Sequence, residues 1–326
     1  MINGYTRFAA ALIAIAGILG QAHAQVPSSE RPVRLVVPFV AGSAVDTVAR
    51  ALGNAMSANL KQVVVVDNKP GANAQVGADS VMQFPADGLT LLLGTMDSHA
   101  LNPLVYSKLR YDPVRDFSPI GLIGTQNLVL VARKGAPFSN GRELIAEARK
   151  TPATLSFGSW GLGSVAHVWI AMMEHSAGVE FLHVPHQGTP QALNLLLGDQ
   201  LDLLFLPPLL AKANQETGKL KIIGSTAAKR GGAVADIPTL AEQGFTGFDG
   251  TTWFALFSRS GISPEVQNRL NVALNAALQD PKVRDTLAGI SMVPAGGKPE
   301  VLARAMASSR EALARAISER KIKLLD

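Results

Sequence analysis

A turn rich in glycine and serine, residues 156–167 (Ser-Phe-Gly-Ser-Trp-Gly-Leu-Gly-Ser-Val-Ala-His), follows one expected strand and enters a helix that stops at Gly178. Small residues let backbone N–H groups face whatever lies at the N-terminus of that helix. No Asp or Glu occurs between Ala148 and Met173, so no carboxylate from within that stretch compensates the positive helix end. The turn therefore predicts a vacant position for an anion from outside the chain.

The chemistry of this turn favours a carboxylate as that anion. No Lys or Arg occurs in residues 151–211, so an arginine clamp is not available there. Binding would then rely on backbone N–H groups and on four side chains: Ser159, Ser164, His167 and His186. Hydrogen bonds to a charged group contribute about 1.5 to 3 kcal/mol each, and three of them approach the free energy of micromolar binding before ordering costs. The alternative is a glycine-rich turn that only packs against its sheet.

The first expected strand ends in a comparable turn, residues 37–46 (Val-Pro-Phe-Val-Ala-Gly-Ser-Ala-Val-Asp), which leads into an amphipathic helix. Ser43, with Asp46 three residues later, fits a capping box, in which two side chains satisfy the first N–H groups of a helix. For this turn both ordinary capping and a ligand contact stay open.

Motifs of other chemistries are incomplete. Residues 161–166 (Gly-x-Gly-x-x-Ala) match a dinucleotide fingerprint, but the acid that must reach a ribose hydroxyl is missing from the end of the next strand, and Glu180 stands at the beginning of that strand instead. The sequence has no P-loop, no G-x-S-x-G motif, no H-E-x-x-H motif and no cysteine. We therefore expect no cofactor and no metal. An exported hydrolase that uses Ser159 or Ser164 with His167 stays open as an alternative.

The elements that must position these turns alternate between short β-rich runs and helical patterns from residue 31 onward, which predicts α/β layers with parallel strands. The expected strands of the first series are residues 35–38, 63–66, 90–93 and 120–123. The alternation of strands and helices then begins again, with expected strands at residues 128–132, 154–157, 181–184, 203–206 and 221–223. A helix is expected at 141–150; after a strand at 253–257, helices follow at 264–278, 281–287 and 299–317, each with a proline in its first turn. Two similar lobes are implied, with a hinge at crossings near residue 125 and within 225–250.

Composition is consistent with a folded, exported protein. The 326 residues are 47% hydrophobic and 17% charged, which excludes a disordered chain, and the lack of cysteine excludes a disulfide scaffold. The formal net charge of +5 is too small to imply a nucleic acid partner. Residues 1–24 have the features of a secretory signal: Arg7, an apolar stretch over residues 8–20, and Ala22-His23-Ala24, after which we expect cleavage.

Further motifs are spread in order along residues 31–326. They include Val36-Val37-Pro38-Phe39, Asn68-Lys69-Pro70-Gly71-Ala72, His99-Ala100-Leu101-Asn102-Pro103, Tyr111-Asp112-Pro113, Val184-Pro185-His186-Gln187-Gly188, Asp236-Ile237-Pro238-Thr239 and Trp253-Phe254. In these motifs the chain resembles the Bug (TctC-like) extracytoplasmic solute-binding proteins of tripartite tricarboxylate transporters. The resemblance implies an α/β, two-lobed periplasmic binding protein (type II, Venus-flytrap), with a mainly parallel sheet flanked by helices in each lobe and a helical C-terminal tail.

The resemblance also implies how the chain is divided and what it does. Residues 25–124 plus 251–326 would form lobe 1 and residues 125–250 lobe 2. A monomer in the periplasm would bind a small organic acid between the lobes, without catalysis, and deliver it to a membrane permease. A dicarboxylate, an amino acid and an aromatic carboxylate all stay open as ligands. A domain that reports its ligand to a signalling partner is a further alternative.

The ligand-binding residues implied by the resemblance come from the loops after four strands. They are Phe39, Ala41, Gly42 and Ser43; Thr95, Met96, Asp97 and Ser98; Ser159, Trp160, Gly161, Ser164 and His167; and His186. Ser43, Met96, Asp97 and His186 depart from the usual family pattern. Asp97, if it faced the cleft, would repel a second carboxylate but could pair with an ammonium, and Trp160 suggests an aromatic wall. The plainer alternatives are that Asp97 caps a turn and that Trp160 packs against the sheet.

Overall fold

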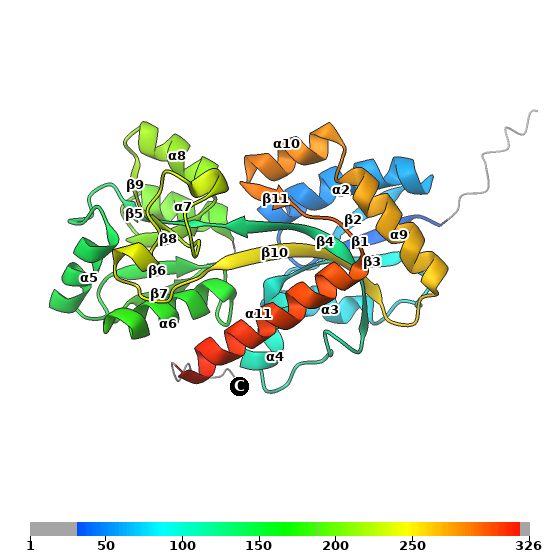
Figure 1. Ribbon diagram of the computed structural model, residues 1–326, viewed down its shortest axis with the longest axis horizontal. Helices are drawn as coiled ribbons and strands as arrows, with labels where there is room; N and C mark the ends of the chain where they lie inside the picture. Colours follow the sequence, from blue (N-terminus) through cyan, green and yellow to red (C-terminus); the bar gives the residue numbers. More distant parts are fainter. Residues whose placement is uncertain (1–30, 187, 320–326) are drawn as a thin grey trace, which may run out of the picture. The chain divides into compact units, whose positions relative to one another are not determined.

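Two mixed β-sheets form the framework of the protein (Figure 1), whose computed structural model describes residues 31–319 apart from residue 187. The six-stranded sheet has the order β11-β4-β10-β3-β1-β2. Its strands are β1 (Val33–Val37), β2 (Val64–Asn68), β3 (Thr90–Thr95), β4 (Phe117–Asn127), β10 (Thr251–Arg259) and β11 (Met292–Pro294). The Val and Leu residues of β1 and β3 are buried on both faces, as expected for strands covered by helices on each side.

The second sheet has five strands in the order β7-β6-β8-β5-β9. Its strands are β5 (Val129–Arg133), β6 (Ser156–Ser159), β7 (Leu182–Pro185), β8 (Leu203–Leu206) and β9 (Leu220–Ser225). Parallel pairing joins β6 to β7 and β8, whereas β5 runs antiparallel to β8 and β9. In the six-stranded sheet, likewise, β1 is parallel to β2 and β3, whereas β10 is antiparallel to β3 and β4. The expectation of mainly parallel sheets is corrected to mixed ones, because the strands next to the chain crossings enter antiparallel.

Helices cover both faces of each sheet. The six-stranded sheet has α2 (Ala44–Leu60), α9 (Pro264–Ala277) and α10 (Pro281–Gly289) on one face, and α3 (Gln75–Val81), the π-helical segment η1 (Asp97–Leu101), α4 (Asn102–Val105) and α11 (Pro299–Glu319) on the other. The five-stranded sheet packs between α5 (Gly141–Lys150) with α6 (Val165–Ala177) and α7 (Thr189–Leu197) with α8 (Pro208–Glu216). Two short 3₁₀ turns, Gly232–Val234 and Ala241–Gln243, precede β10. No helix among the described residues is long and apolar enough to cross a membrane.

The chain passes between the two sheets at two places that are hydrogen-bonded to each other. Leu128 alone separates β4 from β5, and residues 226–250 connect β9 to β10. Thr226, which is fully buried, accepts a hydrogen bond from the Leu128 N–H at 2.9 Å and donates one to the Gly250 carbonyl at 2.6 Å. The division into two lobes, with a hinge predicted near residue 125 and within 225–250, stays a prediction.

The expected strands are all present, with ends displaced by up to a few residues, and 203–206 and 141–150 have the predicted bounds. The short edge strand β11 was not expected, because three residues after a helix carry too little pattern to predict a strand. The expected signal segment, with its cleavage after Ala24, lies outside the described residues.

Candidate functional site

A small cavity lies where the two sheets meet. It has a volume of about 110 Å³ and receives residues from the β1–α2 turn, the end of β3, the β4–β5 crossing, the starts of α7 and α8, and the start of β10. We call it the inner cavity; it is lined by Phe39, Val40, Ser43, Ala44, Val45, Thr95, Asp97, Gln126, Leu128, Trp160, Gly188, Thr189, Phe205, Pro207, Thr252 and Phe254. Of these described lining residues, only Asp97 is charged.

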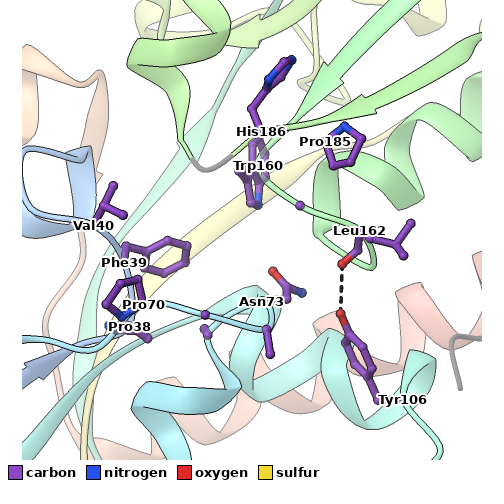
Figure 2. A pocket seen from close by; sticks show the side chains of 14 residues that line it. Pro38, Phe39, Val40, Pro70, Asn73, Tyr106, Trp160, Leu162, Pro185 and His186 are labelled. Atoms are coloured by element: carbon purple, nitrogen blue, oxygen red, sulfur yellow. Dashed lines mark hydrogen bonds between the residues drawn. The ribbon is translucent and has the colours of Figure 1, made fainter.

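A larger and more open cavity of about 510 Å³ lies beside it, the outer cavity (Figure 2). Phe39, Val40 and Trp160 line both cavities. The other residues of the outer cavity are Pro38, Pro70, Gly71, Ala72, Asn73, Ala74, Tyr106, Gly161, Leu162, Pro185 and His186. Its described lining contains no Lys, Arg, Asp or Glu. The Tyr106 hydroxyl donates a hydrogen bond to the Leu162 carbonyl at 2.9 Å, which joins the two sheets at this cavity.

The N-terminus of α2 borders the inner cavity, and its own sequence caps it. Ser43 Oγ accepts a hydrogen bond from the Asp46 N–H at 3.3 Å. The Asp46 carboxylate accepts hydrogen bonds from the Gly42 N–H at 2.9 Å and from Arg50 Nε at 3.0 Å. Burial by itself raises the pKa of Asp46, but the hydrogen bonds from Arg50, Gly42 and Asn68 hold that pKa below its ordinary value. The capping interpretation of this turn is thus confirmed, while Ser43, Ala44 and Val45 still line the cavity.

The N-terminus of α6 is not vacant, contrary to the sequence-based expectation. Asp97 Oδ1 accepts hydrogen bonds from the Val165 N–H at 2.8 Å and from Trp160 Nε1 at 3.2 Å. The search for acids within residues 148–173 could not find this carboxylate, because it comes from the end of β3 in the other sheet. Asp97 is 4% exposed, and burial raises its pKa, although both hydrogen bonds favour the ionised form.

The serine and histidine side chains of the β6–α6 turn are hydrogen-bonded to other groups of the protein. Ser164 Oγ accepts a hydrogen bond from the backbone N–H of His167 as the N-cap of α6, and Ser159 Oγ lies 2.6 Å from Nε2 of His183. His167 stacks on His183, with 4.2 Å between ring centroids, and its Nδ1 accepts a hydrogen bond from the Gly163 N–H. Burial, with smaller contributions from the neighbouring histidines, lowers the pKa of His183 to about 4. Ser159 and Ser164 therefore do not have His167 as the proton acceptor that the hydrolase alternative required.

Three polar atoms near the cavities lack a hydrogen-bond partner among the described residues, and one of them is Oδ1 of Asn73 in the lining of the outer cavity. Thr95 is 2% exposed, lines the inner cavity, and its hydroxyl is unpaired. Nε2 of His186, in the lining of the outer cavity, is likewise unpaired. An unpaired buried hydroxyl costs free energy that a ligand acceptor or donor would recover, so Thr95 is the polar side chain best suited to contact a guest.

The structure brings together only part of the predicted site. Phe39, Ser43, Thr95, Asp97 and Trp160 line the inner cavity, and Gly161 and His186 line the outer one. Seven predicted residues line neither cavity: Ala41, Gly42, Met96, Ser98, Ser159, Ser164 and His167. The ligand-binding role of all the predicted residues stays a prediction.

Sequence reasoning missed the start of α7. Gly188 and Thr189 line the inner cavity, and α7 carries Pro190 in its first turn. Proline at that position is a typical helix start, so the turn after the expected strand at residues 181–184 did contain a usable signal. Gln126 and Thr252, at the ends of β4 and β10, were missed because no local pattern marks a strand end as facing a cavity.

Two helix-covered sheets that enclose a cavity between them, with helix N-termini bordering it, define a two-lobed solute-binding protein. Residues 48–322 match the model of the tripartite tricarboxylate transporter family receptor, TctC. A UPF0065 protein from the tcbD-tcbE intergenic region of Pseudomonas sp. strain P51 is 34% identical over 293 residues, which is 90% of this chain and 87% of that protein.

Solved structures show the same fold. R. palustris Rpa4515 with adipate is 31% identical and superposes with a TM-score of 0.84 over 92% of this chain and all of its own. MatC (Rpa3494) from Rhodopseudomonas palustris with bound malate is 29% identical, with a TM-score of 0.81 over 88% of this chain and 98% of its own. The chain belongs to the TctC family of periplasmic solute-binding proteins, which are not enzymes, and family membership implies a periplasmic location. The predicted class of fold and the predicted family are thus confirmed.

Proposed function

We propose that this protein captures a small organic acid in the inner cavity and delivers it to the membrane permease of a tripartite tricarboxylate transporter. In this proposal the chain is exported by a signal cleaved after Ala24 and works as a monomer. Residues 25–124 with 251–326 would form one lobe, residues 125–250 the other, and the paired crossings at Thr226 and Leu128 the hinge.

One observation carries the proposal: the inner cavity is bounded by the first turns of α2 and α7 and by the unpaired hydroxyl of Thr95. The first N–H groups of a helix have no partner within the helix and carry a partial positive charge. A carboxylate placed there would accept hydrogen bonds from N–H groups and a hydroxyl, with no need for a cationic side chain. Relatives solved with adipate and with malate support an organic acid as the ligand.

A thermal-unfolding screen with a panel of organic acids tests this function. A ligand at 100 times its dissociation constant stabilises the native state by about 2.7 kcal/mol, so an acid that binds will raise the melting temperature measurably. If every carboxylate fails and a neutral compound stabilises the protein, the proposed class of ligand is wrong.

Thr95→Val sharpens the same test for whichever acid of the panel binds. Because a hydrogen bond to a charged group contributes about 1.5 to 3 kcal/mol, loss of the Thr95 hydroxyl should weaken that acid at least tenfold in titration calorimetry. Ser258→Ala is the matched control, since Ser258 is also buried with an unpaired hydroxyl but lines neither cavity. Equal affinity in the wild type and Thr95→Val would remove Thr95 from the site.

A further inference from the structure

The inner cavity already contains one carboxylate that belongs to the protein. Asp97 lines this cavity, and its Oδ1 accepts hydrogen bonds from the Val165 N–H and the Trp160 indole. These two donors come from the five-stranded sheet, whereas Asp97 follows β3 of the six-stranded sheet. The N-terminus of α6 is therefore occupied and cannot receive a carboxylate of the ligand without displacing Asp97.

Neither cavity offers a cation to balance a further negative charge. The described lining of the inner cavity has no Lys or Arg, and neither does that of the outer cavity. Burial lowers the pKa of His186, so its imidazole is neutral at pH 7. Among the described residues, the first turns of α2 and α7 and the unpaired hydroxyl of Thr95 remain as partners for an anion. A second carboxylate in a space of about 110 Å³ would lie close to Asp97 without a compensating charge.

The outer cavity suits an uncharged remainder of the ligand. Phe39 and Trp160, which line both cavities, project into the outer one from the β1–α2 and β6–α6 turns (Figure 2). Tyr106, Leu162 and Pro185 add apolar surface around its volume of about 510 Å³. A chain or ring attached to a carboxylate in the inner cavity could pass these side chains and lose its contact with water there.

Resting on the proposed function, we infer that the ligand is a monocarboxylic acid with an apolar alkyl or aryl tail, and that Asp97 is the residue that selects against a second carboxylate. The carboxylate lies at the first turns of α2 and α7, and the tail extends past Phe39 and Trp160 into the outer cavity. An ammonium on the ligand would have to leave water for a cavity in which Oδ2 of Asp97 is the only charged acceptor left among the described lining residues, because Oδ1 already accepts from two donors.

Two pairs of acids, matched in their tails, test the wild-type protein in titration calorimetry. Hexanoate and adipate differ by one terminal carboxylate, and 3-phenylpropanoate and L-phenylalanine differ by one ammonium. We expect hexanoate to bind at least tenfold more tightly than adipate, and 3-phenylpropanoate more tightly than L-phenylalanine. Adipate or L-phenylalanine binding as tightly as its partner would overturn the inference and leave the proposed function intact. If neither these acids nor any other acid of the panel binds, the proposed function fails and the inference falls with it.

Asp97→Asn tests the residue itself, because asparagine keeps an acceptor oxygen for Val165 and Trp160 but removes the charge. The preference for hexanoate over adipate should shrink about tenfold in this variant. Asp285→Asn, the same change at an exposed position on α10 outside both cavities, should leave the preference unchanged. An unaltered preference in a normally folded Asp97→Asn protein, as judged by its thermal unfolding, would exclude Asp97 as the selecting residue.

Discussion

The N-termini of α2 and α6 are nearly identical in local geometry but differ in where their negative charge comes from. Ser43 and Ser164 are the two N-caps, with φ and ψ of −70° and 164° against −74° and 163°, and each accepts the N–H three residues later at 3.3 Å. The carboxylate at α2 is Asp46, in the first turn of the same helix. The carboxylate at α6 is Asp97, 68 residues before the N–H that it binds. One helix end is compensated by its own sequence and the other by tertiary structure.

The largest expected difference is in stability. Asp97→Ala leaves two donors without an acceptor, the N–H of the fully buried Val165 and the indole of the half-buried Trp160, and should lower the free energy of unfolding by about 3 kcal/mol. Asp46→Ala should cost less, about 1 to 2 kcal/mol, because Gly42 and Arg50 are exposed and can bind water instead. Urea unfolding of both variants measures this difference. If both variants lose the same free energy of unfolding, the donors to Asp97 must be able to bind water when the carboxylate is removed.

These two helix ends also show what the sequence could and could not predict. The Ser43–Asp46 spacing predicted the cap of α2, and the Gly178 stop of α6 was placed correctly, because both depend on neighbours within one turn. The alternation of strands and helices predicted the two sheets for the same reason. The prediction that no carboxylate of the protein lies at the N-terminus of α6 was wrong, because a contact between residues that are distant in the sequence leaves no local pattern.

The same limit applies to the candidate site. Phe39, Ser43 and Thr95 were implied as site residues by the resemblance to the family, and they line the inner cavity. Ser159 and His167 were predicted in the same way, but their side chains bond to His183 and to Gly163 instead. Residue types identify groups that can bind a ligand, whereas the packing of β7 against β6 decides which of them are already used.

A smaller effect, opposite in sign at the two helix ends, should appear when stability is measured against pH. The pKa of Asp46 is lowered in the folded state, so its stabilisation is present above its ordinary pKa of 3.8 and is lost as the pH falls through the folded value. The pKa of Asp97 is raised, mainly by burial, so the folded state binds more protons than the unfolded state above pH 3.8 and its contribution is lost as the pH rises.

Asn variants separate these two contributions. Relative to Asp46→Asn, the wild type should lose stability as the pH falls from about 5 to 3; relative to Asp97→Asn, it should lose stability as the pH rises above about 4. Urea unfolding of the wild type and both variants between pH 3 and pH 8 measures the two slopes. If the free energy of unfolding changed with pH in the same direction for both carboxylates, Asp97 would be as well stabilised in its ionised form, by solvent or by hydrogen bonds, as Asp46.

The smallest expected difference concerns the two serine caps, where the helices should behave alike. Ser43→Ala and Ser164→Ala each remove one acceptor for an N–H in the first turn, and each should lower the free energy of unfolding by about 1 kcal/mol. Because the remote Asp97 binds the Val165 N–H and not the His167 N–H that Ser164 caps, it cannot substitute for the lost hydroxyl. A cost at Ser164 far below that at Ser43 would show that the tertiary carboxylate stabilises the whole first turn of α6, and the two helix ends would then differ in capping as well as in charge.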